Sequence, residues 1–163
     1  MNNYYAHPTC TIDDGCIIGD GTKIWHYSHI YNSAKIGKNC IFGQNVMIGP
    51  NVIIGNNCKI QNNVSIYEGV ILEDNVFIGP SVVFTNVLLP RANVEQKNNF
   101  LKTYVKNGCT IGANSTIVAG NTLGEYSMIG AGSLVTKNIE KFSMNYGAPA
   151  QFIYKVDKFG KKI

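Results

Sequence analysis

The sequence has few charged residues and no long apolar run. Asp, Glu, Lys and Arg make up only 15% of its 163 residues, whereas 45% are hydrophobic, and this balance indicates surface buried in a core or an oligomer. No apolar run approaches the roughly 20 residues that a membrane-spanning helix needs, and residues 1–5 lack the regions of a signal peptide. We therefore expect one domain, located in the cytoplasm and not inserted into a membrane.

Cysteine is present without the spacing of a disulfide or metal framework. The five cysteines are odd in number and form no CxxC pair, which argues against a disulfide scaffold and a zinc knuckle. The net charge is +4, and the C-terminal part is basic. Such a tail either binds phosphate or nucleic acid or is simply solvated. Its lysines are Lys137, Lys141, Lys155, Lys158, Lys161 and Lys162.

A repeat of six residues organises most of the chain. Every sixth residue from Ile12 to Phe84 is large and apolar, and a second series runs from Val105 to Val135. A small or β-branched residue stands two positions earlier, and glycine often follows the large residue, as at Gly43. Neither an amphipathic helix nor an alternating strand has a period of six. The first series is Ile12, Ile18, Ile24, Ile30, Ile36, Phe42, Ile48, Ile54, Ile60, Ile66, Leu72, Ile78 and Phe84.

The repeat predicts a parallel β-solenoid. A short strand with one large and one small inward residue cannot bury its apolar face alone, whereas stacked strands form one continuous core. The break between the two series, at about residues 86–104, is an insertion long enough to be functional. The cysteines all fall at the small inward position, so we interpret them as buried packing residues and not as nucleophiles. They are Cys10, Cys16, Cys40, Cys58 and Cys109.

Six segments carry a resemblance to a known family. They are residues 24–29 (IWHYSH), 61–70 (QNNVSIYEGV), 79–87 (GPSVVFTNV), 90–92 (PRA), 111–120 (IGANSTIVAG) and 130–137 (GAGSLVTK). They resemble the hexapeptide-repeat N-acetyltransferases that modify 3-amino sugars on dTDP or UDP. The chain departs from that family at Leu88-Leu89-Pro90, where Tyr-Asn-Pro is frequent, and at Gly147-Ala148-Pro149, where Gly-Asn-Pro is common.

The resemblance implies an all-β, left-handed parallel β-helix in a single domain, residues 1–163. The handedness rests on the resemblance alone, because right-handed crossovers are the general rule. We expect repeat blocks at 6–85 and 105–136, an active-site loop at 86–104, and a tail at 137–163 that packs on the coils as a helix. Further implications are a homotrimer with sites between subunits, acetyl-CoA as cosubstrate and a nucleotide sugar as acceptor. Neither a metal nor nucleic acid is expected to bind.

For the sugar, the resemblance points to Asn86 as the catalytic contact of the reacting amine, where the coil ends and the insertion begins. Glu68 would accept hydrogen bonds from sugar hydroxyls or attract the ammonium form, and Arg91 would pair with the diphosphate. Each has a structural alternative, as a turn asparagine, an exposed turn carboxylate or a surface arginine. The other candidates are Tyr67, Phe84, Gln44, Asn62 and Asn63, the last three with a structural alternative as a ladder in solenoid turns.

For acetyl-CoA, the resemblance points to two pairs of small residues, Ala119-Gly120 and Ala131-Gly132. Small residues let the pantetheine arm run close to the backbone. Thr136, Lys137 and Pro149 would meet the nucleotide end, although Lys137 has the alternative of a solvated side chain.

The implied reaction is attack of a neutral amine on a thioester. A general base would contribute about 10²–10⁴-fold, but His7, His26 and His29 all precede the insertion by many residues. A sugar amine flanked by oxygens is less basic than lysine, so part of it is neutral at pH 7. Our hypothesis is therefore that no side chain is an obligatory base, that positioning supplies most of the rate, and that the CoA sulfur takes the proton.

Several alternatives remain at this stage. We favour a dTDP-3-amino-3,6-dideoxyhexose, destined for bacterial surface glycans, because residues 100–103 (FLKT) resemble that group, and a UDP-linked 2-acetamido-3-amino uronic acid is the alternative. Serine or sugar hydroxyls are other acceptors found on the same fold. A zinc enzyme of the γ-carbonic anhydrase type would need converging ligands, whereas His26 and His29 are only three residues apart. An ice-binding scaffold would need outward rows of threonine, and here the outward residues are mixed.

Overall fold

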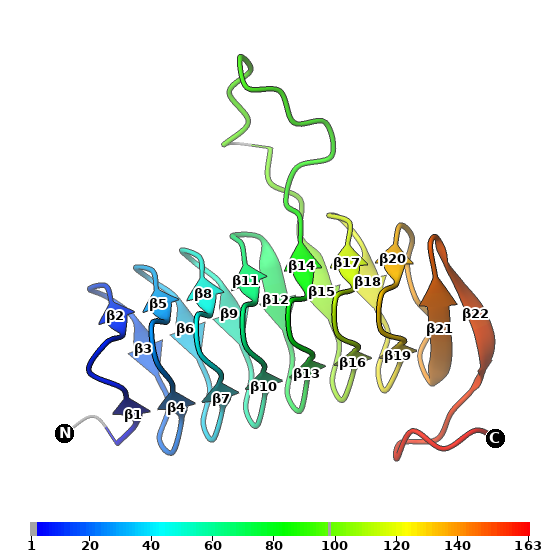
Figure 1. Cartoon of the computed structure of the whole chain (residues 1–163), viewed down its shortest axis with the longest axis horizontal. Coiled ribbons are helices and arrows are strands. Elements are labelled where there is room, and N and C mark those ends of the chain that lie inside the picture. Colours follow the sequence, from blue (N-terminus) through cyan, green and yellow to red (C-terminus); the bar gives the residue numbers. More distant parts are fainter. Residues whose placement is uncertain (1–2, 98) are drawn as a thin grey trace.

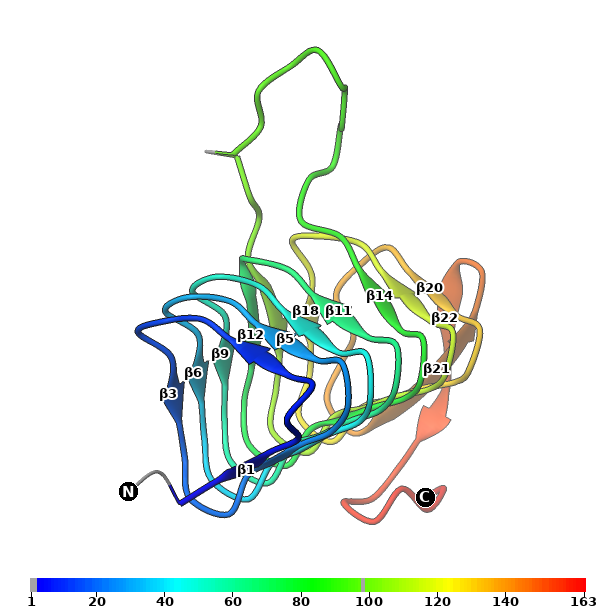
Figure 2. The ribbon, with the colours of Figure 1, turned by 60° about the vertical axis from the view of Figure 1, so that its left-hand side comes forward.

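The computed structural model describes residues 3–97 and 99–163, which form a parallel β-solenoid (Figure 1). Its short strands stack into three sheets, and these sheets form the faces of a triangular coil (Figure 2). Seen from the N-terminal end, the chain winds counterclockwise as it recedes, so the solenoid is left-handed. The expected all-β solenoid is confirmed. The described residues include no helix that could cross a membrane.

Each face is a sheet whose neighbouring strands belong to successive coils. The first face contains β1 (Tyr5–Ala6), β4 (Lys23–Ile24), β7 (Ile41–Phe42), β10 (Lys59–Ile60), β13 (Phe77–Ile78), β16 (Thr110–Ile111), β19 (Met128–Ile129), β21 (Ser143–Gly147) and β22 (Ala150–Lys155). The second face contains β2 (Thr11–Ile12), β5 (His29–Ile30), β8 (Met47–Ile48), β11 (Ser65–Ile66), β14 (Val83–Phe84), β17 (Thr116–Ile117) and β20 (Leu134–Val135). The third face contains β3 (Ile17–Ile18), β6 (Lys35–Ile36), β9 (Ile53–Ile54), β12 (Val70–Leu72), β15 (Thr103–Val105) and β18 (Thr122–Leu123).

Three edges join these faces. The first edge connects the first face to the second, the loop edge connects the second to the third, and the third edge connects the third back to the first. One coil takes 18 residues, as the hydrogen bond between Asn45 and Asn63 of neighbouring coils shows. Residues one coil apart therefore stack on the same face or edge, which is the relationship that builds the site.

The six-residue pattern places its large residues inside the coil. Phe42, Ile60 and Ile78 follow one another along the first face and are fully buried. From Thr22 onward the small inward residues are buried as well, and Thr22 Oγ1 donates to the carbonyl of Gly37 at 2.9 Å. Ile12 is only partly buried, because it belongs to the first coil. The predicted core is thus confirmed.

The edges account for the asparagines and glycines of the sequence. Asn45 and Asn63 have φ of 55° and 60°, a left-handed conformation that asparagine tolerates, and Asn45 Nδ2 donates to Asn63 Oδ1 at 3.0 Å. A Cβ on Gly112 would lie 2.5 Å from the backbone nitrogen of Ala131 in the next coil. Only glycine lets the coils stack that closely.

The cysteines occupy the interior, as interpreted from the repeat. All five are free, and Cys40, Cys58 and Cys109 are buried, whereas Cys10 and Cys16 in the first coil are partly exposed. Burial raises the pKa of the Cys109 thiol to about 12, so this side chain is a neutral packing group at physiological pH.

Two expected boundaries change in the structure. The long insertion leaves the solenoid after β14 and returns at β15 (Figure 1), so it spans residues 85–102 and not 86–104. Thr103 is already a buried inward residue paired with Val70. The expected C-terminal helix is wrong: β21 and β22 form an antiparallel hairpin, because the strand register of the first face continues from Met128 to Met144.

Candidate active site

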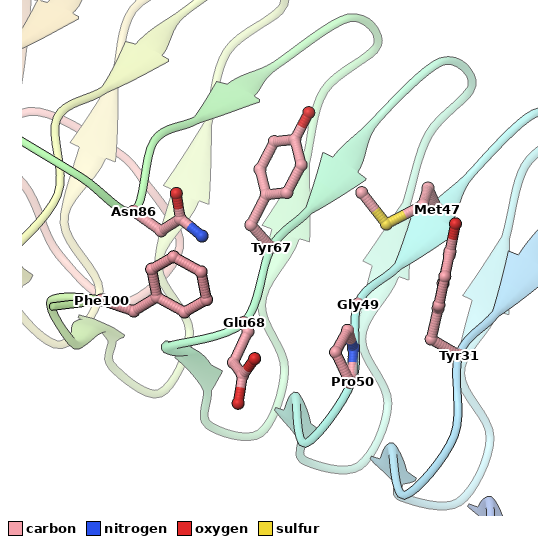
Figure 3. Close-up of a pocket in the computed structure, with 8 residues that line it drawn as sticks. All are labelled: Tyr31, Met47, Gly49, Pro50, Tyr67, Glu68, Asn86 and Phe100. Atoms are coloured by element: carbon pink, nitrogen blue, oxygen red, sulfur yellow. The ribbon is translucent and has the colours of Figure 1, made fainter. Parts of the chain in front are cut away.

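A cavity of about 270 Å³ opens on the loop edge, beside the base of the insertion. Figure 3 shows the side chains of Tyr67, Glu68, Asn86 and Phe100 gathered at one end, with Tyr31 toward the other. Among the described residues, those that line the cavity are Tyr31, Met47, Gly49, Pro50, Tyr67, Glu68, Asn86 and Phe100. Apolar and aromatic groups thus surround one carboxylate and one carboxamide, the usual composition of a small-molecule site.

Asn86 lies where the insertion leaves the coil. Its backbone carbonyl accepts a hydrogen bond from the Leu101 nitrogen at 2.9 Å, and this bond closes the neck of the loop. Its side-chain carboxamide makes no hydrogen bond to any residue that the structure describes, and it lies beside Phe100 in the cavity (Figure 3). A fixed backbone with a free carboxamide suits a residue that binds a ligand.

Glu68 precedes Asn86 by one coil on the same edge. One carboxylate oxygen accepts a hydrogen bond from Asn51 Nδ2 at 2.9 Å, so the side chain is oriented but its second oxygen is available to a ligand. Tyr67 beside it is 41% exposed. None of the residues that line the cavity is Lys or Arg, so Glu68 gives the cavity a negative character.

The other predicted sugar contacts do not line this cavity. The Phe84 ring is 1% exposed and packs in the core, so it cannot touch a ligand outside the coil. Arg91 is exposed in the insertion, where its guanidinium donates to the neighbouring Pro90 carbonyl at 3.5 Å and to no other residue that the structure describes. Gln44 and Asn62 lie on the first edge, and the Gln44 backbone nitrogen donates to Asn62 Oδ1 at 3.0 Å, so Asn62 has the structural ladder role. Asn63 joins the same ladder through Asn45.

Sequence reasoning missed five lining residues, and the coil length would have revealed four of them. Tyr31 and Gly49 stack above Tyr67 at steps of 18 residues, and Pro50 stacks above Glu68 in the same way. Met47 follows His29 along the second face. Phe100 had no such signal, because it lies in the irregular insertion. The missed residues supply most of the apolar lining of the cavity.

The residues predicted to bind acetyl-CoA fall on two different edges. Ala119 and Gly120 are on the loop edge, where their backbone nitrogens donate to Thr85 Oγ1 at 2.9 Å and Thr103 Oγ1 at 3.2 Å. Ala131 and Gly132 are on the first edge, between β19 and β20. The second face separates the two pairs within one chain. A single copy therefore cannot place both pairs along one groove.

The predicted contacts for the nucleotide end lie near the C-terminal end of the solenoid. Thr136 and Lys137 follow β20, and Lys137 Nζ donates to Gln151 Oε1 at 3.3 Å. Pro149 is exposed in the turn between β21 and β22.

The histidines lie on separate surfaces of the first coils. His26, on the first edge, stacks on His7 with ring centroids 3.6 Å apart, whereas His29 projects from the second face and pairs with Asp13 at 2.9 Å. Neither of them lines the cavity. In the part of the chain that the structure describes, no three His, Cys, Asp or Glu side chains are grouped as metal ligands would be.

Comparison with known proteins identifies the family. Residues 15–50 and 51–86 match the family described as bacterial transferase hexapeptide (six repeats), and residues 106–137 match the hexapeptide repeat of succinyl-transferase. The chain belongs to the hexapeptide-repeat transferases. The gap between the matched segments of this transferase, residues 87–105, contains most of the insertion and the cavity-lining residue Phe100.

Two relatives resemble this hexapeptide-repeat transferase over different shares of the chain. A dTDP-3-amino-3,6-dideoxy-alpha-D-galactopyranose 3-N-acetyltransferase from Aneurinibacillus thermoaerophilus is 57% identical over 53 residues, which is 32% of this chain and 28% of that protein. A galactoside acetyltransferase solved with coenzyme A is 28% identical, with a TM-score of 0.57 over 74% of this chain and 70% of that one.

A third relative shares the fold at low identity. A point mutant of GDP-perosamine N-acetyl transferase from Caulobacter crescentus, solved with CoA and GDP-perosamine, has a TM-score of 0.62 at 16% identity and covers 90% of this chain and 54% of that chain. The chain spans less than two thirds of the length of the Caulobacter protein, and likewise of the relative from Aneurinibacillus.

Proposed function

We propose that this transferase acetylates the amino group of a nucleotide-linked sugar, with acetyl-CoA as donor. The observation that carries the proposal is that the Glu68 carboxylate and the Asn86 carboxamide line the same aromatic-lined cavity. Aromatic rings pack on the apolar faces of sugar rings, and Glu68 bonds to hydroxyls and attracts the protonated amine. The ammonium group loses its proton to solvent before attack, and Asn86 holds the neutral amine. The names of the sugar N-acetyltransferases among the relatives support this choice.

We infer further that the sugar is a dTDP-linked 3-amino-3,6-dideoxyhexose. A uronic acid carries a carboxylate that requires a cationic partner, whereas no lysine or arginine lines the cavity and Glu68 would repel a second carboxylate. The C6 methyl group of a 6-deoxy sugar suits the apolar groups of Met47, Pro50 and Tyr31 instead. The 57% identity with the dTDP-3-amino-3,6-dideoxygalactose enzyme favours the same sugar, for use in surface glycans.

We also propose that the enzyme is a homotrimer whose second faces turn toward the threefold axis. The outward strand residues of this face include no Lys, Arg, Asp or Glu, whereas Lys23 and Lys59 project from the first face and Lys35 from the third. In this arrangement the loop edge of one copy meets the first edge of the next. Ala119-Gly120 and the neighbouring copy's Ala131-Gly132 would then line one groove for acetyl-CoA.

The second face can be recognised from the sequence by its outward residues, none of which is Lys, Arg, Asp or Glu. Its outward residues are Thr11, His29, Met47, Ser65, Val83, Thr116 and Leu134.

Sedimentation equilibrium tests the proposed trimer and should give three times the chain mass of 17.9 kDa. Val83→Lys should dissociate the trimer, since it places a charge in the interface. Lys59→Glu on the first face is the matched control. A monomeric wild type would refute the arrangement.

The chemistry follows from positioning. The neutral amine nitrogen attacks the thioester carbon, a C–N bond forms, and the C–S bond breaks as the tetrahedral oxyanion collapses. Backbone N–H groups would stabilise that oxyanion, each contributing about 3 kcal/mol. The amine proton passes to the departing CoA sulfur. We propose no obligatory side-chain base and no metal, consistent with the finding that neither His26 nor His29 lines the cavity.

Release of CoA, measured with a thiol reagent, tests the proposed function. Purified protein receives acetyl-CoA with dTDP-3-amino-3,6-dideoxyglucose, with its galactose epimer or with a UDP-linked 3-amino uronate, and a reaction without sugar corrects for the thiols of the protein. Turnover with one dTDP sugar is expected and identifies the configuration at C4. Turnover with the uronate alone would overturn the sugar assignment, and no turnover of any of the three would overturn the function.

A further inference from the structure

Three side chains of the first two coils form a continuous row of contacts that ends at the cavity. Asp13 Oδ1 accepts a hydrogen bond from His29 Nε2 at 2.9 Å, and the His29 ring stacks on the Tyr31 ring with centroids 3.9 Å apart and planes 21° from parallel. Tyr31 lines the cavity, whereas Asp13 and His29 do not. The imidazole is therefore held at its edge by a carboxylate, and its face supports the phenol ring.

The repeat explains why these residues meet. Asp13 and Tyr31 occupy equivalent positions of successive coils on the loop edge, and His29 stands two residues before Tyr31 on strand β5. On the next coil, Met47 pairs with His29 in register and also lines the cavity. The exposed ring of Tyr31 has His29 on one side, so its orientation depends on that neighbour.

We propose that Asp13 and His29 are positioning residues that hold the Tyr31 ring as the wall of the cavity farthest from Asn86. This role rests on the proposed function, because the ring so held would pack against the nucleotide sugar. A phenol ring fixed before binding loses less conformational freedom when the ligand arrives. His29 acts through Tyr31 and does not touch the reacting atoms.

The same geometry predicts an effect on binding and little effect on stability. In the single chain the side chains of His29 and Asp13 are 36% and 32% exposed, and a polar pair at such exposure contributes little to the folding of the coil. Because His29 also projects from the second face, sedimentation of each His29 variant must match that of the wild type. Loss of the pair frees the Tyr31 ring while the coil stays intact. The proposal thus differs from a purely structural role, which would lower the melting temperature, and from a general-base role, which would lower kcat.

Steady-state kinetics of the full chain test the proposal through a set of variants. Tyr31→Ala and His29→Ala should each raise the KM for the amino sugar by about threefold to tenfold, with kcat, the KM for acetyl-CoA and the melting temperature unchanged. Asp13→Ala should act in the same direction. Asp13→Asn should restore the wild-type KM, because its carboxamide oxygen still accepts from His29. Asp20→Ala, which removes an exposed pair with Lys38, is the matched control.

A double variant shows whether Asp13 acts through Tyr31 or has an independent effect on the KM. Asp13→Ala should have no effect once Tyr31 is already alanine, since residues that act as one unit are not additive. An additive effect, a fall in kcat without a change in KM, or a wild-type KM for His29→Ala would each overturn the proposal.

A crystallographic measurement distinguishes failure of this proposal from failure of the proposed function. Structures of the wild type and of His29→Ala report the Tyr31 ring whether or not the protein acetylates a sugar. Displacement or disorder of the ring in the variant is expected. An unchanged ring would refute the positioning role, even if amino sugars are turned over. A displaced ring in a protein that turns over no amino sugar would refute the proposed function and keep the positioning role.

Discussion

The carboxylate of Glu68 and the carboxamide of Asn86 stand one coil apart on the same edge of the solenoid, and both face one cavity. The insertion begins after Phe84, and the hydrogen bond from Leu101 to the Asn86 carbonyl closes its neck at 2.9 Å. Glu68 is therefore fixed by a regular coil and Asn86 by the closed neck, while the insertion brings Phe100 beside them. This relationship leads to the first two predictions.

Replacement of Asn86 by alanine should reduce kcat by about 10²-fold, if its carboxamide positions the amine in the transition state as a single oriented donor does elsewhere. Thermal stability should be unchanged, because the carboxamide bonds to no residue within 3–97 and 99–163. CoA release and calorimetry check both parts. Asn32→Ala, on the same edge but outside the cavity, is the control and should keep wild-type activity. Full activity of Asn86→Ala would contradict the assignment.

Replacement of Glu68 by glutamine should raise the KM for the amino sugar by about tenfold, since one charge-assisted interaction is lost. The glutamine oxygen can still accept the hydrogen bond from Asn51, so the fold should be preserved. Kinetics with the amino sugar and with acetyl-CoA check the prediction, and only the former KM should change. Glu140→Gln, at an exposed pair with Lys155, is the matched control.

Two glycines should respond differently to substitution. Gly112→Ala should cost about 1–3 kcal/mol of unfolding free energy, because its Cβ meets the backbone of the next coil at 2.5 Å. Gly132 has a φ of +70° and open space around it, so alanine there should cost about 1–2 kcal/mol of backbone strain. Gly132→Asn should restore stability, and Gly112→Asn should not. Urea unfolding measures all four; equal effects of asparagine at both positions would refute the explanation.

Acid should weaken the ion pair between Glu73 and Lys106, whose atoms are 2.7 Å apart. The hydrogen bond from Lys106 holds the pKa of Glu73 below its ordinary value. A lowered pKa contributes stability that is present above the unfolded-state pKa, about 4.3, and is lost as pH falls through the folded-state pKa. The contribution is at most about 1 kcal/mol, because the pair is partly exposed.

Melting temperatures between pH 2 and pH 7 check this prediction. The wild type should lose more stability over this acid range than Glu73→Gln, which has no carboxylate to protonate at that position. Glu140→Gln, which removes a more exposed carboxylate, should follow the wild type. Parallel curves for wild type and Glu73→Gln would show that the pair makes no net contribution.

Only the thiols of the first coil should react in the folded protein. Cys10 and Cys16 are partly exposed, whereas Cys40, Cys58 and Cys109 are buried, and burial holds the pKa of Cys109 near 12. A thiol reagent at pH 8 should therefore titrate two thiols before unfolding and five afterwards. The double variant Cys10→Ser/Cys16→Ser should show none before unfolding. Rapid reaction of that variant would indicate that the coil opens.

Much of the fold could be predicted because each coil repeats one local rule. A large residue at every sixth position, as at Ile60, must point inward, and small residues two positions earlier must pack beside it. The tail was not predictable in this way, since β21 and β22 follow no six-residue pattern. The helix expected there gave way to a hairpin that extends the sheet hydrogen bonding from β19.

The candidate site was only partly accessible to sequence reasoning. Glu68 and Asn86 were identified as candidates from family motifs, and the structure brings them together. Phe84 was predicted to contact the sugar because a family motif does not show which way a side chain points. Its position in the six-residue series already indicated that the ring points inward. Phe100 was missed, because the path of an irregular insertion depends on contacts with the coil.

The sequence by itself determined the coil, its inward residues and the position of the insertion, because a period of six dictates short stacked strands whatever the rest of the chain does. Only the tertiary structure decided which side chains share an edge and face one cavity. Asp13, His29 and Tyr31 meet because one coil of 18 residues places Asp13 above Tyr31, and side-chain directions then determine the contact. Such contacts depend on coil stacking and rotamers, which no local pattern encodes.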